Sequence, residues 1–197
     1  MSAPVSIKSF IIVGSAFAVM GCQSDAQAPQ EAFFEAFSAH CGNAYAGKLV
    51  SKDAADVDFA TKALVMHVRE CSDSVIRIPF HVDDDRSRTW VISKTGNGLR
   101  LKHDHRHKDG SEDAVTQYGG DTVDAGTRAR QSFPVDQFSI DMFKVEGLAA
   151  SVVNVWNVEV DKDSFAYELT RPNRLFRVEF NLTKPLADLP PAPWGFE

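Results

Sequence analysis

The chain has 197 residues and 44% hydrophobic content, which suits one globular domain and excludes an extended disordered protein. The formal net charge is -6, and no run of Lys or Arg is long enough to offset it locally. An acidic surface repels phosphate backbones, so we expect no nucleic acid among the partners.

Residues 1–21 have the character of a signal peptide. Lys8 precedes an apolar run over residues 9–20, which is too short to span a bilayer. The sequence Val19-Met20-Gly21-Cys22 resembles the lipobox of bacterial lipoproteins, in which the cysteine is acylated and becomes the new N-terminus. We therefore expect cleavage before Cys22 and lipidation of Cys22. An ordinary signal peptide cut near Ala26 to Ala28, or an uncleaved anchor, is the alternative.

A lipoprotein of this kind would be secreted to the periplasmic side of the cell envelope and anchored to a membrane by lipid. Gln23 and Ser24 follow the cysteine, and similarity to the sorting rule of enteric bacteria favours the outer membrane over the inner one. Cleavage removes one charged residue, Lys8, so the mature net charge would change from -6 to -7. Residues 22–30 are small and polar, as in a flexible tether. We expect a monomer.

With Cys22 lipidated, two of the three cysteines remain. Disulfides persist in an exported compartment, and the even pair predicts a Cys41–Cys71 disulfide bond. A reactive thiol pair is disfavoured because the chain has no C-x-x-C spacing.

The periodicity of the rest predicts one mainly β domain over residues 31–184, followed by a Pro-rich tail over 185–197. Phe33, Phe34 and Phe37 predict a short amphipathic helix from about 30 to 40. Alternating apolar residues predict strands from residue 43 onward, with a helix or irregular segment at 138–145. The expected strands are 43–49, 63–70, 75–82, 88–94, a long strand from 99, 114–118, 127–133, 151–160, 165–169 and 176–182.

About eight to ten antiparallel strands with one apolar face must close on themselves or pack as two sheets. We expect a single antiparallel β-barrel that resembles the lipocalin/calycin architecture, with the Phe-bearing helix closing one end. A two-sheet β-sandwich is the alternative.

The segment from Gly98 to Asp109 is the main candidate for a site. Strand periodicity puts His103, His105 and His107 on the apolar, inward face. They are candidates for lining a ligand-binding pocket. His103 and His105 also have the spacing of zinc ligands on a strand, but a third ligand would have to come from elsewhere, and His67, His81 and the carboxylates of Asp83 to Asp85 are available. A plain hydrogen-bonded polar cluster at the strand end is the structural alternative.

The chain carries none of the common catalytic motifs: no nucleophile elbow, phosphate loop or zinc-protease helix. The sequence therefore indicates no enzyme class and no catalytic residue, and requires no cofactor other than the zinc of the metal hypothesis.

Four blocks resemble an uncharacterised family of predicted secreted proteins of proteobacteria. They are Cys41-Gly42-x-Ala44-Tyr45-x-Gly47, Lys102-His103-Asp104-His105-Arg106-His107, Tyr118-Gly119-Gly120-Asp121-Thr122 and Phe133-Pro134-x-Asp136. The resemblance covers most of residues 33–182. It implies export and a single domain, and it carries no assigned activity.

Three functions remain open on the sequence. The first is a barrel that binds a small apolar or amphipathic ligand near the histidines. The second is a metal-binding protein or metal-dependent enzyme that uses them as ligands. The third is a structural or assembly lipoprotein that acts through its surface.

Overall fold

The computed structural model describes residues 28–197. The predicted signal peptide, the predicted lipidation site Cys22 and most of the predicted tether lie outside the described residues. The helices are α1 (Pro29–Ser38), α2 (Val57–Ala60) and α3 (Gln137–Val145), with 3-10 turns η1 (Ala54–Asp56) and η2 (Ala149–Val153). The strands are β1 (Ala44–Leu49), β2 (Leu64–His67), β3 (Glu70–Cys71), β4 (Val75–Val82), β5 (Asp85–Thr95), β6 (Gly98–His105), β7 (Tyr118–Asp121), β8 (Arg130–Pro134), β9 (Val155–Val160), β10 (Ser164–Arg171) and β11 (Arg174–Asn181).

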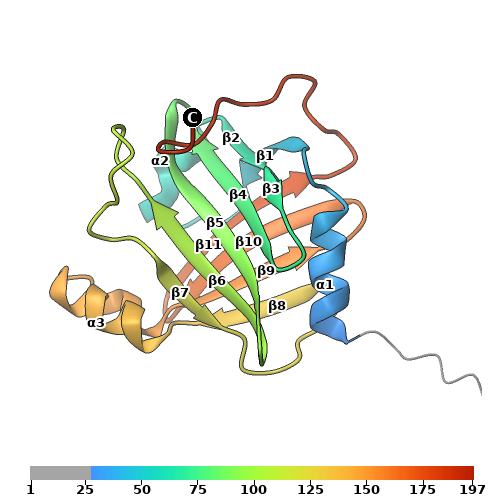
Figure 1. Ribbon diagram of the computed structural model, residues 1–197. Coiled ribbons are helices and arrows are strands. Elements are labelled where there is room, and N and C mark those ends of the chain that lie inside the picture. Colours follow the sequence, from blue (N-terminus) through green and yellow to red (C-terminus); the bar gives the residue numbers. More distant parts are fainter. Residues whose placement is uncertain (1–27) are drawn as a thin grey trace, which may run out of the picture.

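The strands form an antiparallel, nearly closed barrel, as the sequence predicts (Figure 1). Their spatial order is β7-β6-β5-β4-β2-β1-β11-β10-β9-β8, with short β3 paired to β4 on the side. Apart from β7 and β8, consecutive strands on this path are hydrogen-bonded to one another, and β1 pairs with β11, so that the first and last strands are neighbours. This up-and-down meander confirms the expected barrel and excludes the two-sheet sandwich.

The barrel has one seam, between β7 and β8. The backbone N–H of Asp136 donates to the carbonyl of Gly119 across it, at 2.9 Å. A Cβ on Gly119 would lie 1.9 Å from the carbonyl oxygen of Leu101, and one on Gly120 would lie 1.7 Å from that of Pro134. Only glycine permits so close an approach on both sides of β7.

Several predicted strands are wrong in their bounds. The predicted strand 63–70 is divided into β2 and β3, and the predicted strand 127–133 begins only at Arg130, in β8. Residues 114–117 form a turn, and the strand begins at Tyr118 and continues through the two seam glycines. A run with two glycines has low strand propensity, so the periodicity placed the strand too early. Residues 151–153 belong to η2 and not to β9. Residues 137–145 are helical, with Asp136 as the N-cap.

The barrel interior is filled largely by aromatic rings. Trp90 stacks between Phe80 and Tyr167, with ring centroids 4.7 and 4.4 Å away. At one end, helix α1 inserts Phe33 and Phe37, and the Phe37 ring meets the edge of Phe165 at 5.1 Å. Helix α1 thus closes this end, as the Phe spacing predicts, while α2 lies at the opposite end (Figure 1).

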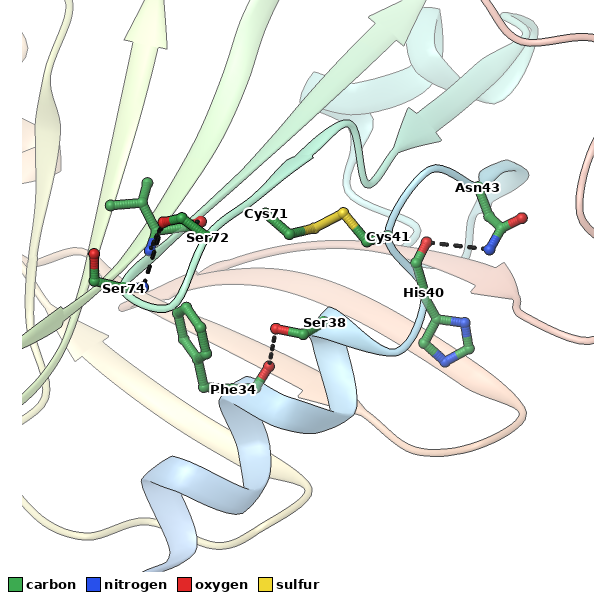
Figure 2. Close-up of a disulfide and its surroundings, with 9 residues drawn as sticks. Phe34, Ser38, His40, Cys41, Asn43, Cys71, Ser72 and Ser74 are labelled. Carbon is green, nitrogen blue, oxygen red and sulfur yellow. Dashed lines mark hydrogen bonds between the residues drawn. A yellow bond between two sulfur atoms is a disulfide. The ribbon is translucent and has the colours of Figure 1, made fainter.

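The Cys41–Cys71 disulfide is confirmed, with the two Cα atoms 6.2 Å apart. It joins the loop that follows α1 to β3 (Figure 2). The bond therefore fastens the closing helix to the barrel. A disulfide indicates an oxidising compartment outside the cytoplasm.

The C-terminal segment 185–197 lies on the outer face of the barrel and is held by arginines. Arg86 donates to the carbonyl of Ala192 at 2.5 Å, and Arg69 donates to that of Phe196 at 2.9 Å. The guanidinium of Arg106 lies 4.8 Å from the Phe196 ring centroid. No helix within residues 28–197 is long and apolar enough to cross a membrane.

Candidate functional site

A cavity of about 180 Å³ lies at the barrel end that α1 leaves open. Its walls are side chains from the inward faces of several strands and from α2: Phe59, Phe80, Trp90, His103, His105, Tyr118, Tyr167, Leu169 and Phe176, with Arg88, Arg174 and Asp56 among them. A cavity of about 150 Å³ with apolar walls binds benzene. This cavity therefore has the size of a single ring with a small substituent.

A larger depression of about 700 Å³ lies elsewhere, by the start of β10. Its rim includes the exposed side chains Lys48, Asp163 and Lys184. It gathers no aromatic cluster or histidine, so the smaller cavity is the stronger candidate.

His103 forms part of the cavity wall and is almost completely buried, with 2% of its surface exposed. Its Nδ1 lies 3.0 Å from the carbonyl oxygen of Tyr118, and its Nε2 lies 2.7 Å from the Tyr167 hydroxyl. A carbonyl only accepts, so Nδ1 carries the proton of the neutral ring and Nε2 accepts from Tyr167. Burial lowers the pKa of His103 to about 3, and the ring is neutral at pH 7.

His105 follows two residues later and reaches the mouth of the cavity. Its Nε2 lies 3.1 Å from the hydroxyl of Tyr118. The Tyr118 ring also stacks on His103, with centroids 4.4 Å apart. Burial, with the nearby Arg88 charge, lowers the pKa of His105 to about 4, and burial raises the pKa of Tyr118. The two histidines and two tyrosines therefore form one neutral hydrogen-bonded cluster.

His107 does not join this cluster. Strand β6 ends at His105, and the side chain of His107 is 57% exposed beyond it, near Asp113. The alternation that predicted three inward histidines stops because the chain bends toward the turn at Gly110, where the backbone N–H of Gly110 donates to the carbonyl of His107 at 2.9 Å.

The candidate third metal ligands do not converge with His103 and His105. His81 and His67 are buried, but strand alternation puts them on the outer face of β4 and β2, across the sheet from the cavity. Within residues 28–197, no group of three or more His, Cys, Asp or Glu is placed to hold a metal ion. Both ring nitrogens of His103 are moreover engaged in hydrogen bonds.

Two arginines that were not predicted as site residues, Arg88 and Arg174, lie at the mouth of the cavity. Arg174 donates to both carboxylate oxygens of Asp56 at 2.5 Å and lies 3.3 Å from Asp53. This contact holds the η1–α2 segment over the mouth, where Phe59 meets the edge of Phe176 with centroids 5.3 Å apart. Arg88 lies two residues before Trp90 on β5, so its side chain is on the same inward face. It donates to Asp85 at 2.5 Å. Strand alternation could have identified both arginines. Counting back two residues from the inward side chains Trp90 and Phe176 gives Arg88 and Arg174.

The outward side of β6 is partly buried. Asp104 is 3% exposed and accepts from Arg106, just beyond the end of the strand, at 3.0 Å. The C-terminal segment covers this side, with Phe196 over Arg106. Arg100, also on this side, pairs with Asp121 at 2.6 Å.

Comparison of the chain with models of protein families, with curated proteins and with solved structures finds no match. The resemblance to predicted secreted proteins of proteobacteria stays a prediction, and the barrel itself is what the structure adds to it.

Proposed function

We propose that this protein is a binding protein of the cell envelope that holds a small apolar or amphipathic ligand in the cavity at the barrel mouth. The observation that supports this most is the cavity itself. The rest of the barrel is filled with large side chains, yet about 180 Å³ remains open between Trp90, Tyr118 and Phe176.

The chemistry of the walls favours binding over catalysis. An efficient general acid or base has a pKa near the operating pH. The pKa of His103 lies at about 3 and that of His105 at about 4, while burial raises the pKa of both Tyr118 and Tyr167. At neutral pH these four side chains supply fixed hydrogen bonds and apolar faces, which orient a ligand without exchanging protons with it.

The metal hypothesis and the surface hypothesis have weaker support. His103 and His105 lack a convergent third ligand within residues 28–197. The exposed apolar side chains cluster mainly around α3 and η2, where Phe138, Val145 and Val153 are exposed by 57%, 82% and 52%. Nothing in the structure indicates what would cover them.

The proposal is tested by titrating the purified, isotope-labelled protein with benzyl alcohol, a neutral single-ring probe, and following backbone and indole NMR signals. We expect saturable shifts at Trp90, His105 and Tyr118. Leu169→Trp should abolish them, because the larger ring fills the cavity. Leu175→Trp is the matched control, because Leu175 is 43% exposed on β11 and does not line the cavity. Equal shifts in both variants would refute the proposed site.

A further inference from the structure

This inference rests on the proposed function and concerns the chemical class of the ligand. We infer that the cavity takes a small ring-bearing carboxylate, whose ring lies among the aromatic walls and whose carboxylate is bound by Arg88 at the mouth.

Arg88 lies between two other side chains of the cavity wall. Its register partners are Phe80 on β4 and His105 on β6, and all three side chains line the cavity. A guanidinium at this place is adjacent to the aromatic walls and still 29% exposed toward solvent. A ligand whose ring enters the cavity would therefore keep its polar end beside Arg88.

The guanidinium of Arg88 has unused hydrogen-bonding capacity. Nη1 of Arg88 donates to Asp85. Its Nε and Nη2 have no hydrogen-bond partner among residues 28–197, and they are not among the fully buried unpartnered atoms. These two N–H groups form one edge of the guanidinium, whose fork geometry matches the two oxygens of a carboxylate.

The carboxylates at the mouth, in contrast, are already bound. Asp56 receives two hydrogen bonds from Arg174, and Asp85 accepts from Arg88 and from the backbone N–H of Ser87 at 3.0 Å. Asp53 lies 3.3 Å from Arg174 and accepts from the backbone N–H of Ala55 at 2.9 Å. The spare capacity at the mouth therefore consists of donors, and donors select an anionic or acceptor-rich ligand end over a cationic one.

His105 offers a second contact on the same side of the cavity. When the Tyr118 hydroxyl donates to its Nε2, the proton of the neutral ring sits on Nδ1. That Nδ1 has no hydrogen-bond partner in the described part of the chain and is not fully buried. It is thus available to donate to a carboxylate oxygen held by Arg88.

The experiment compares three probes that share one ring and differ in the charge of the substituent: benzoate, benzyl alcohol and benzylamine. Their dissociation constants are measured by calorimetry at neutral pH on the wild-type protein. We expect benzoate to bind about tenfold to a hundredfold more tightly than benzyl alcohol, as for a hydrogen-bonded charged group, and benzylamine to bind most weakly.

Arg88→Met removes the guanidinium while keeping a long apolar side chain, and should reduce the benzoate affinity to that of benzyl alcohol. Arg88→Lys keeps the charge but loses the fork, and should lose most of the preference. Arg100→Met is the matched control, because it removes the same charge from an exposed ion pair with Asp121 away from the cavity. It should leave all three affinities unchanged.

The outcomes separate this inference from the proposed function. Equal binding of benzoate and benzyl alcohol, or a preference for benzylamine, overturns the carboxylate class and leaves the ligand cavity in place. Binding of none of the probes overturns both. Should Arg88→Met fail to fold, the three wild-type affinities still decide.

Discussion

His103 illustrates how the interior of this barrel uses polar side chains. A buried imidazole without partners would be costly, but both of its ring nitrogens are hydrogen-bonded and its faces contact Tyr118 and Trp156. The ring is therefore part of the core and part of the cavity wall at once.

This burial makes the stability of the protein sensitive to acid. The pKa of His103 is about 3 in the folded protein and 6.5 in the unfolded chain, so the unfolded chain takes up the proton first as the pH falls. The contribution of neutral His103 to the free energy of unfolding is thus fully present above pH 6.5, and it is lost as the pH falls toward 3. Between pH 7 and 4.5 we expect His103 alone to account for a loss of about 2 to 3 kcal/mol. Urea unfolding at several pH values measures this loss.

His103→Gln should reduce the pH dependence, because an amide can accept from Tyr167 and donate to the Tyr118 carbonyl without titrating. His81 and His105, with pKa values of about 4, would retain the rest. His107→Gln is the matched control on an exposed histidine, and should behave like the wild type. A free energy of unfolding that is constant from pH 7 to 4.5 would contradict the buried, neutral state of His103.

The sequence predicted His103 and His105 as inward residues because strand alternation is a local property. It failed for His107, since the end of β6 is set by the turn at Gly110 and by pairing with Glu112 through Arg106. Arg88 was missed, although alternation from Trp90 puts its side chain on the inward face of the predicted strand 88–94. The contacts of Tyr118 and Tyr167 with the histidines span 13 and 64 positions along the chain, and no spacing rule identifies them.

At the scale of elements, the closing helix was the most predictable part. Three phenylalanines on one side of a ten-residue helix are all buried, because an apolar stripe must be covered. The seam between β7 and β8 was the least predictable. It depends on the two glycines and on the N-cap of α3, where Asp136 accepts from the backbone N–H of Ser139 at 2.8 Å and binds Lys102 at 2.5 Å.

The Cys41–Cys71 disulfide should stabilise the folded protein measurably. Cys41 and Cys71 are separated by 30 positions, and closing a loop of that size stabilises a fold by about 3 to 4 kcal/mol in the chain-entropy model. The double variant Cys41→Ser/Cys71→Ser should therefore unfold at a clearly lower urea concentration. Wild-type protein unfolded with a thiol reductant is the control and should match the variant. Unchanged midpoints would show that α1 is held by its phenylalanines alone.

In the whole molecule, the two ends of the barrel differ because helix α1 fills only one of them. Helix α1 precedes β1 and packs into one end of the barrel, and the cavity lies at the other end. There the η1–α2 segment forms the cover, joined to the rim by Arg174 and Asp56. Alternation and turn residues predicted the barrel, whereas the size of its cavity depends on how many rings pack together, which only the structure shows.

The predicted lipid anchor at Cys22 gives a test in cells. Wild-type protein should partition with the membrane fraction and incorporate labelled palmitate, because an acylated cysteine anchors the chain. Cys22→Ser should lose the label and the anchored state. Wild-type protein that is exported but remains soluble and unlabelled would instead favour an ordinary signal peptide.

We propose that the cavity between Trp90, Tyr118 and Phe176 receives a ligand of single-ring size. A crystal structure from crystals soaked in benzyl alcohol tests it most directly. We expect density for one ring in this cavity, bounded by Trp90 and the His103–Tyr118 stack. A cavity closed by Phe59 and Leu169, with no ring bound, would contradict it.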